Sequence, residues 1–322
     1  MSLFGRTRCL PMRAGRSGGP KAKVSDLSSP SGSVNTTKHP RRRMATHMDA
    51  VQLMFSLPGV VFAARIGMQE RGSGPTIVIM LKSVDASRDV AARVEALDWR
   101  RIAQDVDERG NALIADLLSA CDCHAMASCY ADDALFRSRV VMASHGFGRG
   151  EYKYFSYPLP QLVAALRASL YPRLAPIANR WNESLRLALR YPPTLAQFLA
   201  RCHEAGQQRP TPLMLQYGPG DYNCLHQDLY GEWVFPLQMT ILLSQPGEDF
   251  TGGEFVMTEQ RPRMQTRPEV VPLSRGDAVV FAVHHRPVAG SRGVYRVNLR
   301  HGVSRVRSGR RHTLGIIFHD AK

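Results

Sequence analysis

The sequence predicts a mainly β protein with flanking helices, built on a double-stranded β-helix of the jelly-roll or cupin-like kind. After Pro212, eight short apolar runs suited to strands follow one another without a helical period between them. Upstream, apolar residues recur at helical spacing, so we expect N-terminal helices to buttress one sheet of the barrel. With 322 residues, 44% of them hydrophobic, the chain can bury a substantial core in one or two domains.

The first helix is expected over residues 97–109, where the apolar period stops at Gly110. Residues 111–118 indicate a short strand, followed by a helix rich in cysteine. Four residues here could indicate zinc: Cys121, Cys123, His124 and Cys129. Because no second Cys/His pair with zinc-site spacing follows, we favour small buried thiols over a metal site.

A longer helical segment is expected over residues 159–189. Leucines recur there at helical spacing, at Leu162, Leu166 and Leu170. Proline interrupts helices, so we expect breaks near Pro172 and Pro176. The eight strands are then expected at residues 213–217, 225–229, 237–243, 253–258, 269–273, 278–283, 295–301 and 311–318.

The motif His226-Gln227-Asp228 lies on the second of these strands. Residues two apart on a strand project from the same face, so His226 and Asp228 can bind one metal while Gln227 points away. Two imidazoles and one carboxylate hold non-haem Fe(II) and leave positions open for a co-substrate and O2. A third ligand must come from elsewhere, and the later histidines compete for that role: His284 with His285, His301, and His312.

Among these histidines, only His301 is followed by an arginine at the tenth residue, Arg311, with Val306 and Gly309 in between. An iron that oxidises with a keto-acid needs a cation for the distal carboxylate, and the arginine fork provides it. Arg311 shares a strand face with small residues, whereas Arg310 shares the bulky face of His312 and Leu314. We therefore favour Arg311 over Arg310.

The ordered set of motifs resembles the Fe(II)/2-oxoglutarate-dependent dioxygenase superfamily. The members of the set are His226/Asp228, Gly252-Gly253, Gly276-Asp277, His301 and Arg311. The residue pattern from Tyr217 to the final Ile-Ile-Phe-His-Asp is similar to that of prolyl-hydroxylase-like members of the superfamily. It is most similar to that of a bacterial subgroup proposed to act on nucleic acid. The resemblance covers about residues 205–322 and reaches back more weakly to 97.

The resemblance implies that His226, Asp228 and His301 hold Fe(2+), and that Arg311 binds the distal carboxylate of 2-oxoglutarate. Tyr217 would hydrogen-bond the same carboxylate; the alternative is a core phenol with a paired hydroxyl. O2 is the second co-substrate, and ascorbate is a candidate reductant. The reaction would hydroxylate a C–H bond and release succinate and CO2. The competing interpretation is a metal-free jelly roll with incidental histidines.

Three functions follow from this reading. The first is oxidative demethylation of alkylated DNA or RNA, with a rim for a flipped base formed by Arg149, Tyr152, Lys153, Tyr154, Phe155 and Tyr157. The second is hydroxylation of proline or another protein side chain. The third is a metal- or 2-oxoglutarate-binding sensor without turnover. The rim stretch has an alternative as a structural loop and strand, and four arginines near the barrel mouth suit phosphate or an acidic protein: Arg286, Arg292, Arg296 and Arg300.

The net charge of +15 is uneven along the chain. Residues 1–48 hold ten Lys/Arg and one acid, which leaves 32 basic and 26 acidic residues in the remainder. The composition of this leader is that of a disordered segment, either a phosphate-binding arm, a solvated tail, or a stretch upstream of a true start at Met44 or Met48. We expect a poorly defined extension over 49–96, a dioxygenase domain over 97–322, no membrane segment, and a cytoplasmic setting.

Overall fold

The computed structural model describes residues 51–57, 60–70, 75–84 and 86–322. The expected basic leader over residues 1–48 lies outside these described residues, so its interpretation stays a prediction. Within the expected extension, three strands form an antiparallel sheet in sequential order: β1 (Val51–Leu57), β2 (Val60–Glu70) and β3 (Pro75–Val84). The domain boundaries that we expect at residues 49 and 97 likewise stay predictions.

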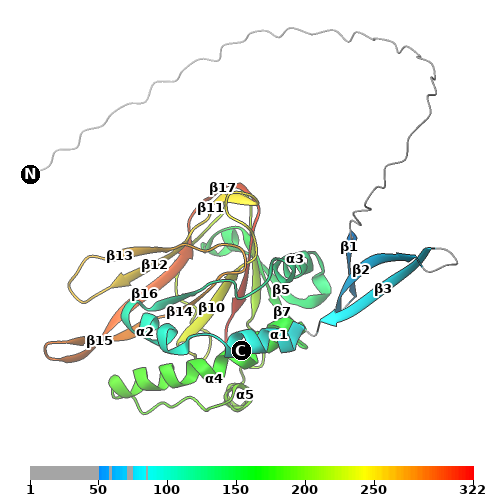
Figure 1. Cartoon of the computed structure of the whole chain (residues 1–322). Helices are drawn as coiled ribbons and strands as arrows, with labels where there is room; N and C mark the ends of the chain where they lie inside the picture. Colours follow the sequence, from blue (N-terminus) through cyan, green and yellow to red (C-terminus); the bar gives the residue numbers. More distant parts are fainter. Residues whose placement is uncertain (1–50, 58–59, 71–74, 85) are drawn as a thin grey trace, which may run out of the picture. The chain divides into compact units, whose positions relative to one another are not determined.

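The larger sheet of the following part has seven antiparallel strands (Figure 1). Their order is β4 (Asn111–Ile114), β14 (Ala278–Ala282), β10 (Leu237–Leu242), β18 (Arg311–Ile316), β8 (Leu213–Tyr217), β7 (Glu151–Phe155) and β5 (Phe136–Val141). Every residue of β10 and β14 is buried. Burial on both faces explains why β14 is continuously apolar, whereas in β10 Gln238 and Thr240 alternate with apolar residues and line the cavity described below.

A second antiparallel sheet faces the first. Its order is β13 (Arg267–Val271), β12 (Phe255–Gln260), β16 (Gly293–Val303), β9 (Tyr222–His226) and β6 (Gly148–Arg149), and β15 (His285–Gly290) pairs along β16. A short ribbon is formed by β11 (Phe250–Gly252) and β17 (Val306–Gly309). Two facing antiparallel sheets with these connections confirm the predicted double-stranded β-helix.

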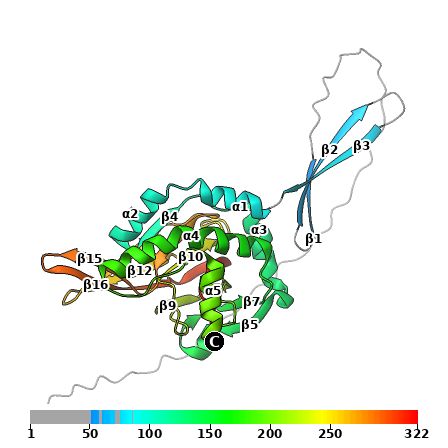
Figure 2. The same ribbon diagram turned by 90° about the horizontal axis from the view of Figure 1, so that it is seen from below.

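Helices cover the outer face of the seven-stranded sheet (Figures 1 and 2). They are α1 (Ala86–Glu95), α2 (Trp99–Arg109), α4 (Gln161–Ser184) and α5 (Leu195–Glu204). Helix α2 ends at Gly110, whose φ of 80° is the left-handed conformation that glycine adopts without strain. The expected helical buttress is therefore present, and it packs on the sheet that contains β14 and β18.

The expected breaks at the prolines of α4 are wrong, because the helix runs unbroken through Pro172 and Pro176. Both prolines lie on the exposed side of the helix, and so does Ala168, whose carbonyl loses its partner at Pro172. Water can hydrogen-bond to these freed carbonyls. The opposite side of α4, including Leu166 and Leu170, is fully buried, so packing outweighs the missing backbone bonds.

The cysteine-bearing helix is α3 (Ala120–Ser128), which begins with a capping box between Ser119 and Asp122. Cys123 is fully buried, and burial raises the pKa of its thiol to about 12. Among the described residues, the grouping of His, Cys, Asp and Glu that could hold an ion lies elsewhere. One of the three thiols, Cys123, is thus buried as expected, whereas Cys121 and Cys129 are partly exposed, and the preference for structural thiols over a zinc site stays a prediction.

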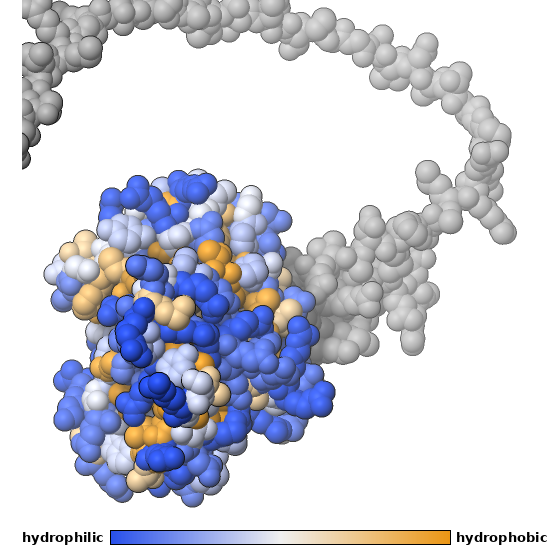
Figure 3. Space-filling model, turned by 90° about the vertical axis from the view of Figure 1, so that its left-hand side faces the viewer, coloured by the Kyte–Doolittle hydropathy of each residue, from blue (hydrophilic) through white to orange (hydrophobic). Residues whose placement is uncertain are grey.

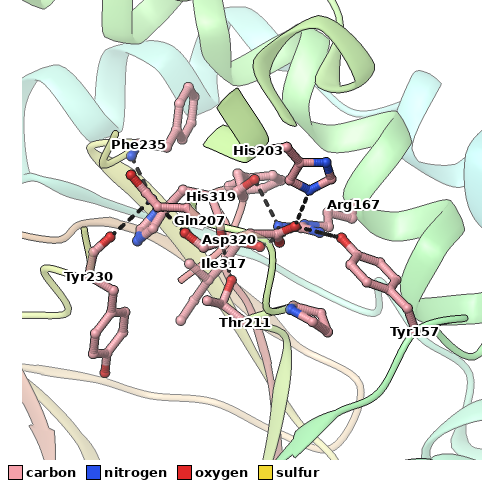
Figure 4. A network of polar contacts seen from close by, with 12 residues as sticks. Tyr157, Arg167, His203, Gln207, Thr211, Tyr230, Phe235, Ile317, His319 and Asp320 are labelled. Carbon is pink, nitrogen blue, oxygen red and sulfur yellow. Dashed lines mark hydrogen bonds and ion pairs between the residues drawn. The ribbon is translucent and has the colours of Figure 1, made fainter. Parts of the chain in front are cut away.

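A buried ion pair ties the segment that follows β18 to the helices (Figure 4). The guanidinium of Arg167 on α4 lies 2.7 Å from Asp320 and also donates to the carbonyls of Ile317 and Phe318. Tyr157 and His203 bond the same carboxylate at 2.9 Å. Both charges are buried, but the Asp320 carboxylate is bonded by Arg167, Tyr157 and His203, and the remaining guanidinium N–H groups reach carbonyl or hydroxyl oxygens, which is the condition under which a buried pair is tolerated.

Candidate active site

Three predicted ligands lie together between the two sheets. His226 at the end of β9 is the direct cross-strand neighbour of His301 on β16. The Nε2 atoms of both rings lie 3.4 Å from the carboxylate oxygens of Asp228. One ligand atom from each residue falls within 4.8 Å of the others, the only such group among the described residues. These separations suit a single ion held at about 2.1 Å from each atom.

Asp228 reaches this group from a loop, which corrects the expected strand over residues 225–229. Strand β9 ends at His226, and Asp228 lies two residues beyond it. Gln227 does point away, because its amide donates to the carbonyls of Leu299 at 2.8 Å and His284 at 3.3 Å. The turn is thus fixed by a side-chain amide that satisfies backbone carbonyls, and not by strand alternation.

Hydrogen bonds orient two of the candidate ligands. The Nδ1 atom of His226 lies 2.8 Å from the carbonyl of Cys224, which can only accept, so Nδ1 carries the proton and Nε2 faces Asp228 with its lone pair free. Asp228 accepts from the Tyr230 hydroxyl at 2.7 Å and from the Gln238 amide at 2.8 Å. The sequence reasoning missed Gln238, although an amide inside the apolar β10 was a usable signal.

The electrostatics of the cluster suit a divalent cation. Burial would raise the pKa of Asp228, but hydrogen bonds and charge from His226 and His301 hold it well below its usual value. Burial and the neighbouring His226 lower the pKa of His301. For His226, burial opposes protonation, but Asp228 raises the pKa above its ordinary value. The carboxylate is therefore ionised, and His301 offers an uncharged imidazole, which is the form that ligates metals.

A cavity of about 370 Å³ opens beside the three ligands. Arg311 and Tyr217, fully buried cross-strand neighbours on β18 and β8, line it. Among the described residues, the Tyr217 hydroxyl and the Arg311 Nε have no hydrogen-bond partner, and Arg311 pairs with no carboxylate. Its Nη1 donates to the Thr313 hydroxyl at 2.5 Å. A buried cation and a phenol left unpaired around one cavity fit a carboxylate ligand.

Arg310, just before β18, and Arg311, its first residue, differ in exposure as the alternation of the strand predicted. Arg311 is 1% exposed and shares the cavity with Thr313 and Gly315, whereas Arg310 is exposed. Leu314 is buried in the core on the other side of β18. Burial lowers the pKa of Arg311 to about 10, so the guanidinium stays charged at neutral pH. The structure brings Arg311 to the metal cluster's cavity; its role toward a co-substrate stays a prediction.

Some residues of the aromatic and basic stretch expected to form a rim line the cavity, and others have structural contacts instead. Tyr152 and Tyr154 line the cavity, with ring centroids 5.4 Å apart. Lys153 and Phe155 face the other side of β7, where the Lys153 ammonium bonds Asp133 at 2.6 Å and is buried. Tyr157 is held by Asp320. Half of the stretch is therefore structural, as the alternative interpretation held.

The four arginines expected near the barrel mouth differ in exposure. Arg286 is buried and lies 2.5 Å from the carboxylate of Glu259, so it is not available to a ligand. Arg292, Arg296 and Arg300 are exposed. Along β16, Arg296 and Arg300 alternate with the buried Val297, Leu299 and His301, which places the two arginines on the outer face of the sheet.

Residues 150–321 match the Oxygenase-NA family, which is described as "Oxygenase, catalysing oxidative methylation of damaged DNA". The chain belongs to this family. The Oxygenase-NA match spans the three candidate metal ligands together with Tyr217 and Arg311, and with the His-Asp-His cluster it confirms the predicted enzyme class, a 2-oxoglutarate-dependent non-haem iron dioxygenase. The uncharacterized protein Rv2227 of Mycobacterium tuberculosis strain H37Rv is 47% identical over 196 residues, covering 59% of this chain and 84% of that protein.

Solved structures with a related fold are more distant. A prolyl-4-hydroxylase of Pseudomonas putida is 15% identical with a TM-score of 0.41, covering 67% of this chain and 96% of its own. An oxidoreductase of the 2OG-Fe(II) oxygenase family from Burkholderia pseudomallei is 17% identical with a TM-score of 0.40, covering 70% and 93%. In the part of the chain that the structure describes, no helix combines the length and apolar character needed to cross a bilayer.

Proposed function

We propose that this Oxygenase-NA member binds Fe(2+) and 2-oxoglutarate at the His226, Asp228 and His301 cluster and oxidatively demethylates alkylated nucleic acid. The observation that supports the co-substrate is the cavity beside the cluster, where the Nε atom of buried Arg311 and the hydroxyl of buried Tyr217 lack hydrogen-bond partners among the described residues. When bound, iron and 2-oxoglutarate together supply the oxidation, with succinate and CO2 as products. Ascorbate as a reductant and a cytoplasmic setting, where Fe(2+) and 2-oxoglutarate are available, belong to the same proposal.

Different residues of the chain would hold the metal and the co-substrate. With a metal bound, His226 and His301 would ligate through Nε2, and Tyr230 and Gln238 hold the Asp228 carboxylate in one orientation. Arg311 would receive the distal carboxylate of 2-oxoglutarate in a two-point ion pair, with the Tyr217 hydroxyl as a third donor. Because Arg311 is almost fully buried, such a pair is sheltered from water and salt, which makes it strong.

The substrate class rests on two observations. The family is described by action on damaged DNA, and the aromatic side chains of Tyr152 and Tyr154 line the cavity, where a base could stack. Hydroxylation of an N-methyl group gives an unstable hemiaminal that releases formaldehyde, so an oxygenase with this site would remove such a methyl. The base must leave the duplex or come from a single strand to reach a buried metal site.

The test is succinate and formaldehyde production by purified full-length protein with Fe(2+), 2-oxoglutarate and O2. Three samples are compared: no substrate, single-stranded DNA carrying 1-methyladenine, and a proline-rich peptide. Stimulation by the DNA, with formaldehyde formed in proportion to succinate, is the expected result. Stimulation by the peptide alone would establish a protein hydroxylase instead. If iron loading is confirmed and none of the samples yields succinate, the binding-only sensor becomes the better account.

A further inference from the structure

A one-residue bulge in the edge strand β5 brings an arginine to the face of the sheet that lines the cavity. Phe136 lies opposite Phe155 on β7 and Ser138 lies opposite Tyr154, so Arg137 is an extra residue between them. An extra residue in one strand redirects its side chain, and such bulges are frequent next to active sites. The Arg137 guanidinium lies over the Tyr154 ring, 4.5 Å from its centroid, which is the distance of a cation–π contact.

Tyr154 connects this arginine with the metal cluster. It lines the cavity together with Tyr230, whose hydroxyl lies next to that of Tyr154 and donates to Asp228 at 2.7 Å. Tyr154 and Tyr230 therefore lie between the guanidinium and a candidate metal ligand. That separation is of the same order as the base and sugar of one nucleotide, so a base inside the cavity would leave its phosphate near Arg137.

The positive charge beside Tyr154 is not neutralised by the fold. The Arg137 Nε donates to the Pro210 carbonyl at 2.9 Å, and the two Nη groups have no hydrogen-bond partner among the described residues. Burial lowers the pKa of Arg137 most, and the charge of the exposed Arg209 lowers it further. The charge of Asp320 also acts on Arg137, but this carboxylate is already held in the buried ion pair with Arg167. A bound anion would supply the missing acceptors and reduce the repulsion between the two cations.

Exposed positive charge on the second sheet lacks this relation to the cavity. Arg296 and Arg300 are exposed, but they lie on the outer face of β16, opposite to the face that carries His301. The side of the molecule where the β12–β13 and β15–β16 hairpins end is largely hydrophilic, with apolar patches between (Figure 3). A hydrophilic surface alone therefore does not distinguish a substrate site. Arg137 differs because its charge lies against an aromatic ring of the cavity wall.

We infer that Arg137 binds a phosphate of the nucleotide whose base enters the cavity beside Tyr154, with Arg209 as a second cation at the same place. This inference rests on the proposed function, because it names the contact by which the same site would recognise nucleic acid. A guanidinium fork matches two phosphate oxygens, and an aromatic ring next to it suits a base. A proline-rich peptide carries no phosphate for this arginine.

The first experiment measures formaldehyde release by the full chain with Fe(2+), 2-oxoglutarate and O2. The substrate is 1-methyladenine, supplied as the deoxynucleoside and as the middle base of a DNA trinucleotide. Arg137→Gln should raise the KM of the trinucleotide about 10-fold and change its kcat and the KM of the nucleoside less than about twofold, because only the trinucleotide supplies phosphate. Arg137→Lys keeps the charge without the fork and should give an intermediate KM. Arg296→Gln is the charge-matched control and should behave as the wild type.

The second experiment separates binding from turnover by measuring fluorescence anisotropy of labelled single-stranded DNA on the full chain without iron. Arg137→Gln should reduce the slope of log affinity against log salt by about 0.7, the contribution of one phosphate contact on a single strand, and Arg296→Gln should not. An unchanged slope in Arg137→Gln, or an equal rise in KM for nucleoside and trinucleotide, would overturn this inference alone, since Arg137 would then only support Tyr154. Absence of demethylation of both substrates by the wild type would overturn the proposed function itself.

Discussion

Gly253 leaves the space through which the Arg311 side chain reaches the cavity. A Cβ at Gly253 would lie 3.0 Å from Arg311 Cδ and 2.9 Å from Val306 Cγ2, and the residue adopts a φ of 65°. The glycine pair of the sequence pattern therefore has a local physical role. It is a gap beside the guanidinium, in a backbone conformation that other residues rarely adopt.

Gly253→Ala should displace Arg311 and raise the 2-oxoglutarate concentration needed for half-maximal succinate production. Gly247→Ala is the control, because Gly247 has a φ of 84° but nothing within 4 Å of the added carbon. Both variants should lose about 1–2 kcal/mol of unfolding free energy from the left-handed backbone. Equal 2-oxoglutarate requirements in the two variants would show that the gap does not position Arg311.

Arg311→Ala should raise the 2-oxoglutarate requirement by roughly two orders of magnitude, since truncating one partner of a buried charged pair costs about 2–5 kcal/mol. Arg310→Ala should change it less than about twofold, because Arg310 is exposed and its side chain lies outside the cavity. Co-substrate titrations of both proteins check this. The reverse ranking would mean that the strand face was misassigned.

Asp228→Ala should abolish tight Fe(2+) binding and iron-dependent turnover, because it removes the anionic member of the cluster. Calorimetric titration with Mn(2+), a surrogate that does not oxidise in air, gives a readout independent of activity. Asp221→Ala is the control, since Asp221 lies outside the metal cluster and partly pairs with Arg149. Wild-type metal affinity in Asp228→Ala would refute the ligand assignment.

These three predictions use residues that sequence reasoning found, and the reason is local. His226 and Asp228 are two residues apart, and Arg311 lies on a strand whose alternate residues differ in size, so period-2 geometry could be applied within each segment. Gln238 and Tyr230 were missed because they meet Asp228 only through pairing and loop closure, which no local period encodes. Even the correct placement of Asp228 rested on the wrong element, a strand in place of a loop.

For the fold as well, local sequence patterns predicted some elements and missed those that depend on contacts between distant segments. Eight strands after residue 212 were predicted because they are short and apolar, but the more polar β11, β15 and β17 in the same region were missed. Upstream, β5, β6 and β7 were not recognised as additions to the two sheets. Their sequence is mixed basic and aromatic, since one face lines the cavity and the other carries the buried Lys153. Arg286 was misjudged for a similar reason, because its partner Glu259 is distant in sequence.

His319 predicts a pH dependence of stability. It is fully buried, its Nδ1 accepts the Phe235 N–H at 3.2 Å, and burial together with Arg167 lowers its pKa to about 4. Because the unfolded chain binds this proton near pH 6.5, the stabilisation is complete above 6.5 and is lost as pH falls toward 4, by about 3 kcal/mol. His319→Asn, which keeps an acceptor without titrating, should flatten urea midpoints between pH 7 and 4.5. The exposed His124→Asn should not.

The ion pair on α4 offers a matched comparison within one helix. Arg167→Met leaves Asp320 buried and under-neutralised, so the unfolding free energy should fall by about 3–5 kcal/mol. Arg173→Met removes an exposed pair with Glu95 and should cost less than about 1 kcal/mol. Denaturant unfolding of both variants measures the difference. Similar losses in the two would mean that water reaches the buried pair.

The amide of Gln207 has a consequence for the position of the metal cluster. Its oxygen accepts from the N–H groups of Glu232 and Trp233, and its nitrogen donates to the carbonyls of Tyr230 and Asp320. The loop that carries Asp228 and Tyr230 is thus wrapped around one side chain that follows α5. In the folded protein the position of that loop therefore depends on both the helical layer and the segment that follows β18. A change at Gln207, which lines no part of the cavity, would reach the metal cluster through the loop.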